Sequence, residues 1–249
     1  MTFILANACV VTVNGTNDIL EGGSVLVRDD RIAAIGNAAA LKAEAPEAEV
    51  IDCAGNILMP GMVNTHTHLF QTLLKGPGDD MVLKKWFTCM TGPAAVELTE
   101  ADAYAAAMHG CVESIRSGVT TLVDFMYVHP RRGLTRAVIN AYEESGMRGF
   151  VCRGFLSDGV EYGVPQALIE TPEAALADAR ALIRQQNRPG GRVQVGIAPC
   201  MIWALRFPST VSPPRCSAGR WARGWIISMT FTALPTRLFI PNSPPPKPA

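Results

Sequence analysis

The sequence predicts an α/β fold: the first half of a TIM-like (β/α)8 barrel, preceded by an N-terminal segment of short strands. Two observations lead to this prediction. Along residues 59–205, strand-like apolar runs alternate with capped helices, the pattern of a parallel sheet with right-handed crossovers. Residues 1–58 instead contain short β-branched runs separated by turn residues. Four strand–helix units make half of an eight-unit barrel.

The N-terminal segment should be mostly strands. Asp29-Asp30 lies between two apolar runs and favours a tight hairpin. An alanine-rich stretch before Pro46 predicts a short helix, because proline cannot continue one. The expected elements are strands at 3–13, 24–27, 32–35 and 49–52 and a helix at 38–45.

The barrel segment carries clear helix boundaries. Thr99 is a good N-cap with Asp102 in the capping-box position. Thr171-Pro172 starts another helix, and Gly118 and Gly146 end two helices. The expected strands are 57–63, 119–125, 149–155 and 193–198, and the expected helices are 99–117, 134–145 and 171–186.

Composition excludes several classes of protein. Apolar residues make up 48% of the chain and the formal net charge is zero, so we expect neither a disordered chain nor a general attraction to nucleic acid or anionic membrane. No apolar run reaches the ~18 residues of a membrane-spanning helix. The seven cysteines are scattered singly, which favours reduced thiols and a cytoplasmic location.

Residues 206–249 have a different character. They contain nine prolines, six basic residues and no Asp or Glu, yet also Trp221, Trp225 and Phe231. A flexible Pro-rich tail usually lacks such large apolar groups. Together with the high content of Arg, Ser, Ala and Gly, this favours a frameshift near codon 205 and a non-native or disordered tail, a hypothesis that resequencing the gene tests.

A pair of histidines carries the chemistry. His66 and His68 follow the first barrel strand, and alternate residues of a strand point to one face with Cα atoms roughly 6.5–7 Å apart. Both imidazoles can therefore reach one metal ion, which would lower the pKa of bound water towards ~7. HxH alone is weak evidence, because neighbouring histidines are often ordinary surface residues.

The surrounding sequence strengthens this interpretation. Residues 59–68, Met-Pro-Gly-Met-Val-Asn-Thr-His-Thr-His, closely resemble a signature of the amidohydrolase superfamily. Residues 27–36, 51–56 and 117–124 are similar to its N-terminal hairpin, its approach to the first barrel strand and its second strand. Residues 68–76 and 79–86 are similar to the chlorohydrolase and deaminase branch. The resemblance covers about residues 1–205.

This resemblance implies a metal-dependent hydrolase: a barrel joined to a β-sandwich built from both chain ends, one divalent metal (zinc or iron) and hydrolytic loss of ammonia, or another leaving group, from a small heterocyclic substrate. It implies His66 and His68 as metal ligands and allows a homo-oligomer. Gln71, Trp86 and His129 are candidate substrate contacts. The family's later ligands and its proton-shuttling glutamate find no counterpart, since the last histidine is His129.

Several alternatives stay open. A cyclic amidohydrolase would use a lysine on the fourth strand, which residues 193–200 lack. A truncated, inactive fragment or pseudoenzyme would hold little metal, and a nucleic-acid-binding role would depend on the basic tail. Asp124 is expected to be a structural carboxylate rather than a site residue and His109 an ordinary helix residue. Arg153 needs a substrate or structural carboxylate as partner.

Overall fold

A computed structural model describes residues 1–198. The Pro/Arg-rich segment 206–249, on which the frameshift hypothesis depends, lies outside the described residues. Among the described residues, the chain divides into two compact units, one containing Met1–Val63 with Gly118–Thr120 and the other containing Asn64–Ser117 and residues 121–198. The domain boundary predicted at residue 58 stays a prediction. Among the described residues, no helix is long and apolar enough to cross a membrane.

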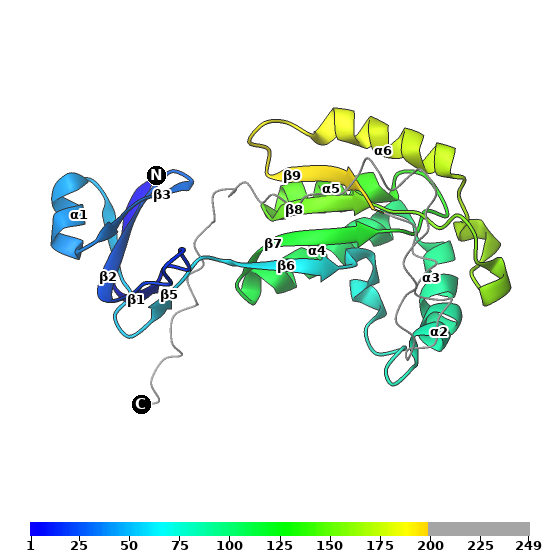
Figure 1. Cartoon of the computed structure of the whole chain (residues 1–249), viewed down its shortest axis with the longest axis horizontal. Coiled ribbons are helices and arrows are strands. Elements are labelled where there is room, and N and C mark those ends of the chain that lie inside the picture. Colours follow the sequence, from blue (N-terminus) through cyan, green and yellow to red (C-terminus); the bar gives the residue numbers. More distant parts are fainter. Residues whose placement is uncertain (199–249) are drawn as a thin grey trace. The chain divides into compact units, whose positions relative to one another are not determined.

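The first unit is a five-stranded sheet with one helix (Figure 1). Its strand order is β3-β2-β1-β4, with β5 also paired to β1. The predicted hairpin is confirmed, since β2 and β3 pair antiparallel around Asp29, whose φ is +55°. The elements are β1 (Thr2–Val11), β2 (Ile19–Arg28), β3 (Arg31–Gly36), α1 (Ala38–Glu44), β4 (Glu49–Asp52) and β5 (Ile57–Leu58).

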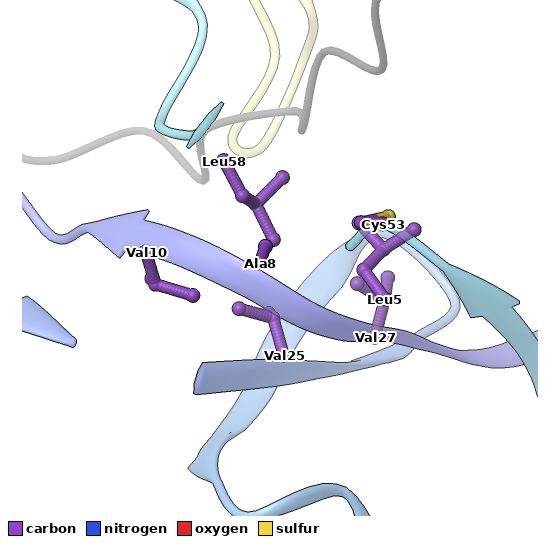
Figure 2. Close-up of a cluster of buried hydrophobic side chains, with 7 residues drawn as sticks. All are labelled: Leu5, Ala8, Val10, Val25, Val27, Cys53 and Leu58. Carbon is purple, nitrogen blue, oxygen red and sulfur yellow. The ribbon is translucent and has the colours of Figure 1, made fainter. Parts of the chain in front are cut away.

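A bulge in β1 decides which side chains enter the core of this unit. The register with β2 shifts between Leu5 and Ala8, where Asn7 has a φ of +62°. A bulge adds a residue to one strand and changes which residues face the core. One buried cluster consists of Leu5, Ala8, Val10, Val25, Val27, Cys53 and Leu58 (Figure 2).

The second sheet has the strand order β6-β7-β8-β9. The pairs β7–β8 and β8–β9 are parallel, and helices connect the strands (Figure 1). This is the first half of a (β/α)8 barrel, as the sequence predicted. The strands are β6 (Met62–Thr67), β7 (Val119–Met126), β8 (Arg148–Arg153) and β9 (Val193–Ile197), and the connecting helices are α4 (Glu100–Arg116), α5 (Leu134–Ser145) and α6 (Pro172–Gln186).

The predicted helix ends have the expected chemistry. Thr99 and Asp102 form a complete capping box at the start of α4, and the Thr171 hydroxyl accepts a hydrogen bond from the Ala174 amide at the start of α6. Gly146 ends α5 with a φ of +73°, a conformation that favours glycine.

The connection between β6 and α4 contains more helix than the sequence indicated. It is built from short pieces, none of which is long enough to show a clear amphipathic period. They are the 3-10 helix η1 (Leu69–Leu74), α2 (Leu83–Trp86), the π-helical turn η2 (Phe87–Thr91) and α3 (Gly92–Glu97). Two further 3-10 turns, η3 (Val160–Tyr162) and η4 (Gln166–Leu168), follow β8.

Candidate functional site

The two histidines lie side by side at the carboxyl end of β6. The ring centroids of His66 and His68 are 5.0 Å apart, and the ring planes are nearly perpendicular. The Asn64 side chain accepts a hydrogen bond from the His66 amide at 3.0 Å, which fixes the backbone at this end of the strand. Active sites of such barrels lie at the carboxyl ends of the strands.

The neighbouring strand fixes the tautomer of His68. Its Nδ1 lies 2.9 Å from the carbonyl oxygen of Phe125, and a carbonyl only accepts hydrogen bonds, so Nδ1 carries the proton. The Nε2 lone pair is then available to a ligand, the arrangement typical of metal-binding histidines. Burial lowers the pKa of His68, and the nearby His66 lowers it further against the opposing effect of the Phe125 carbonyl. His68 is therefore neutral at pH 7, as a metal ligand must be.

The His68 ring packs against an aromatic cluster. The His68 ring contacts the rings of Phe125 and Tyr127 at centroid distances of 5.8 and 5.2 Å. Tyr127 also packs against Phe70 and Phe87, and all three are buried. The Gln71 amide nitrogen donates to the Tyr127 hydroxyl at 2.6 Å, so the glutamine side chain is held in place.

A pocket of about 370 Å³ includes both histidines. Gln71 and Trp86, two predicted substrate contacts, line the same pocket. Sequence reasoning did not anticipate the other residues, whose positions depend on the short helices after β6. The remaining lining residues are Thr67, Thr72, Leu74, Lys75, Gly76, Gly78, Asp79 and Met90.

Gly78 allows Trp86 and Met90 to approach the loop closely. A Cβ atom at Gly78 would lie 2.5 Å from Trp86 Cδ1 and 2.7 Å from Met90 Cε, closer than real side chains allow. The flat indole and the flexible thioether thus depend on a glycine here. Lys75, at the same pocket, is paired with the carboxylate of Glu113 at 2.5 Å.

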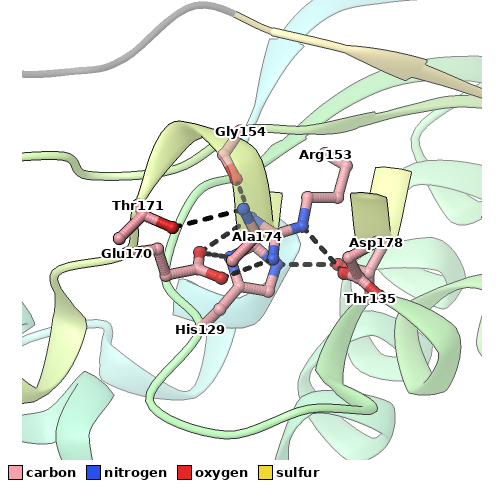
Figure 3. A network of polar contacts seen from close by, with 8 residues as sticks. All are labelled: His129, Thr135, Arg153, Gly154, Glu170, Thr171, Ala174 and Asp178. Carbon is pink, nitrogen blue, oxygen red and sulfur yellow. Dashed lines mark hydrogen bonds and ion pairs between the residues drawn. The ribbon is translucent and has the colours of Figure 1, made fainter. Parts of the chain in front are cut away.

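His129 takes part in a separate polar network (Figure 3). Its Nε2 lies 2.8 Å from the Thr135 hydroxyl. Its Nδ1 lies 3.4 Å from Glu170 Oε2, close enough for an ion pair if the ring were protonated but without hydrogen-bond geometry. Burial lowers the pKa of His129 despite Glu170, which acts in the opposite direction. The ring is therefore neutral at pH 7, and it is not among the residues that line the histidine pocket.

Arg153 finds its partners within the protein. The buried guanidinium makes two hydrogen bonds to the Glu170 carboxylate, at 2.7 and 2.8 Å, and a third to Asp178 at 3.0 Å. Burial would raise the pKa of Glu170, but the neighbouring His129 ring and the hydrogen bonds from Arg153 outweigh this effect and hold the pKa at about 2. Of the two partners that the sequence left open for Arg153, the structure provides the structural carboxylates.

A second pocket lies at the opposite ends of the strands. It has a volume of about 360 Å³ and adjoins Val193, the first residue of β9. Its lining includes Glu143, Arg188 and Arg192 but no histidine. The amino ends of barrel strands serve stability rather than catalysis, so the histidine pocket is the candidate site.

The donor set fits a divalent metal but is incomplete. Two imidazoles, one with its second nitrogen already bonded to a carbonyl, suit zinc or iron. Within residues 1–198, however, no group of three or more His, Cys, Asp or Glu side chains is placed to hold an ion. His109 is exposed on α4, as expected for an ordinary helix residue. His66 and His68 thus provide part of a coordination sphere.

Fold and sequence together place the chain in a family. The model of the amidohydrolase family matches residues 57–206, and the bacterial imidazolonepropionase-like composite domain matches residues 25–48. The chain therefore belongs to the amidohydrolase family, and the resemblance seen in the sequence is confirmed.

Among individual proteins, the chain is similar to 5-methylthioadenosine/S-adenosylhomocysteine deaminases. It is 34% identical over 203 residues to that of Syntrophomonas wolfei and 31% identical over 193 residues to that of Bacillus cereus strain 03BB102. These matches cover 80% and 78% of the chain. The chain spans only 42% of the length of either relative.

Solved structures show the same fold over the same part of the chain. Atrazine chlorohydrolase from Arthrobacter aurescens TC1, complexed with zinc, matches with a TM-score of 0.71 at 21% identity. Guanine deaminase from C. acetobutylicum, with bound guanine, matches with a TM-score of 0.68 at 22% identity. Each match covers 80% of this chain and 46% of the other, so the chain corresponds to part of the barrel.

Proposed function

We propose that this chain provides the first half of the active site of a metal-dependent hydrolase of non-peptide carbon–nitrogen bonds. The reaction we favour is aminohydrolysis of a heterocyclic ring. One observation carries the proposal. The ring centroids of His66 and His68 lie 5.0 Å apart at one pocket, and the Nδ1 of His68 is hydrogen-bonded to a backbone carbonyl. The deaminases among the relatives and the zinc-complexed chlorohydrolase support it.

The residues around the pocket suit a flat polar ring. His66 and His68 would hold the metal, which supplies Lewis acidity for activating water at neutral pH. Trp86 and Met90 would contact the faces of the ring, since indole and thioether groups pack well on aromatic surfaces. The Gln71 amide, held by Tyr127, would bond to a polar atom of the ring. These contacts would orient the ring carbon towards the histidines.

A second candidate function is that of an inactive fragment or pseudoenzyme. Catalytic zinc usually has three protein ligands, and the described residues bring only two histidines together. The general acid–base glutamate expected for the family is unassigned. We therefore propose that turnover needs donor groups beyond His66 and His68, and that the chain alone has little activity.

Further features complete the proposal. The metal would be zinc or iron, with zinc favoured by the zinc-complexed neighbour. We propose a cytoplasmic location, which the five free cysteines of the described residues support. We also propose a homo-oligomer, supported by exposed apolar side chains such as Ile19 and Val50, and light scattering tests it.

Metal analysis combined with an ammonia assay tests these proposals. The chain is loaded with zinc or iron, dialysed, and compared with the His66→Ala/His68→Ala double variant. Metal retained by the wild type alone supports the site, and equal metal in both proteins overturns it. Metal-dependent ammonia release from aminopurines or aminotriazines would identify a working enzyme. Metal without ammonia would identify a half site.

A further inference from the structure

Strand β7 holds the chain directly after the histidines through two consecutive contacts. The Phe125 carbonyl accepts from His68 Nδ1 at 2.9 Å. The Asp124 carboxylate accepts from the backbone amide of Leu69 at 2.8 Å. Neighbouring residues of one strand therefore bind neighbouring residues of the other segment, at the point where β6 gives way to the helix η1. One contact holds the His68 ring, and the other holds the backbone amide that follows it.

Asp124 occupies an unusual place for a carboxyl group. It lies on the same face of β7 as Leu122 and Met126, and all three are fully buried. Its second oxygen, Oδ2, has no hydrogen-bond partner, and no salt bridge is present at Asp124 among the described residues. Burial raises the pKa of Asp124 to about 7. Burying a polar group with an unsatisfied atom costs free energy, so apolar packing of the core gives no reason for a carboxyl group at this position.

We infer that Asp124 is a positioning residue: its carboxyl oxygen fixes the peptide between His68 and Leu69, and thereby the orientation in which His68 enters the pocket. This inference rests on the proposed function, in which His68 is a metal ligand. Groups that orient metal ligands through hydrogen bonds commonly affect metal affinity 10- to 100-fold. Asp124 orients His68 through the backbone, because the Leu69 amide nitrogen that it binds is two bonds from the His68 Cα.

A merely structural role makes different predictions. The Leu69 amide is the first of η1 and, like other amides at helix starts, has no partner within its helix. If Asp124 only satisfied that amide, its loss would lower stability and leave metal affinity unchanged. If it positions His68, metal affinity must fall by more than general destabilisation explains. Asparagine keeps an acceptor oxygen in the same place, whereas leucine of similar size removes it.

Cobalt binding to the full-length chain, followed by visible absorption, tests the inference. The Asp124→Leu variant should bind Co²⁺ about 10- to 100-fold more weakly than wild type, and Asp124→Asn should restore most of the affinity. Leu122→Ala is the matched control, because it lies on the same face of β7 and destabilises the core without removing an acceptor. Wild-type affinity in Asp124→Leu, or an equal loss in Leu122→Ala, would overturn the inference.

Hydrogen exchange at the Leu69 amide provides a measurement that needs no metal. In the wild type this amide should exchange slowly, and in Asp124→Leu it should exchange at the rate of an unprotected amide. Fast exchange in the wild type would overturn the inference even if the variant does not fold. If the wild type binds no cobalt, the proposed function fails, while protection of Leu69 still reports whether Asp124 holds the turn.

Discussion

Replacing Glu170 with glutamine should destabilise the barrel unit markedly at neutral pH. Glu170 receives two hydrogen bonds from the buried guanidinium of Arg153, and its side chain is only 17% exposed. Its pKa of about 2 lies below the ordinary value of 4.5, and a difference of about 2.5 corresponds to about 3 kcal/mol. Removing one partner of a buried ion pair lowers the unfolding free energy by a similar amount, about 3–5 kcal/mol.

The stability difference between wild type and Glu170→Gln should depend on pH. The pKa of Glu170 is lowered in the folded chain, so its stabilisation is fully present above the unfolded-state pKa near 4.5 and is lost as the pH falls towards 2. The difference in unfolding free energy between wild type and Glu170→Gln should therefore be largest near pH 7, and it should narrow below about pH 4.5.

Urea unfolding followed by far-UV circular dichroism measures this difference at several pH values. Glu161→Gln is the matched control, because Glu161 is an exposed glutamate in the same connection after β8, and its replacement should change little. Equal stability of wild type and Glu170→Gln at pH 7 would refute the reasoning. So would a difference that stays constant down to pH 2.5.

Three further substitutions have expected outcomes. Thr99→Ala removes the N-cap of α4 and should cost about 1 kcal/mol in thermal unfolding, more than Thr99→Ser. Leu134→Ala leaves a cavity at a fully buried position and should lower the unfolding free energy by about 2–5 kcal/mol in the same assay. Gly78→Ala forces a Cβ against Trp86, so it should change the near-UV circular dichroism and lower the unfolding free energy by about 1–3 kcal/mol. In Gly15→Ala the new Cβ meets no atom within 4 Å, so neither the spectrum nor the stability should change.

Local sequence signals predicted much of the fold. Thr171-Pro172 and Gly146 fixed helix ends because capping depends on a few adjacent residues, and α5 and α6 begin and end as expected. The sequence did not predict the short helices after His68, because they are stabilised by packing against distant parts of the barrel. The Leu69 side chain, for example, lies within reach of Gly110 on α4.

The candidate site was predictable only in part. His66 and His68 were predicted as a pair because residues two positions apart on a strand point to the same face. The partners of Arg153 were not, since Glu170 and Asp178 lie 17 and 25 residues further along the chain. Spacing alone cannot show which side chains meet when connections of this length intervene. For the same reason, the sequence did not single out Met90 as a residue of the pocket.

X-ray absorption spectroscopy of the zinc-loaded chain tests the central claim most directly. If His66 and His68 bind one ion, the spectrum should show imidazole nitrogens at about 2.0–2.1 Å, and this signal should disappear in the His66→Ala/His68→Ala variant. A spectrum without imidazole scattering, or one that the double substitution leaves unchanged, would contradict the assignment of these histidines as a metal site.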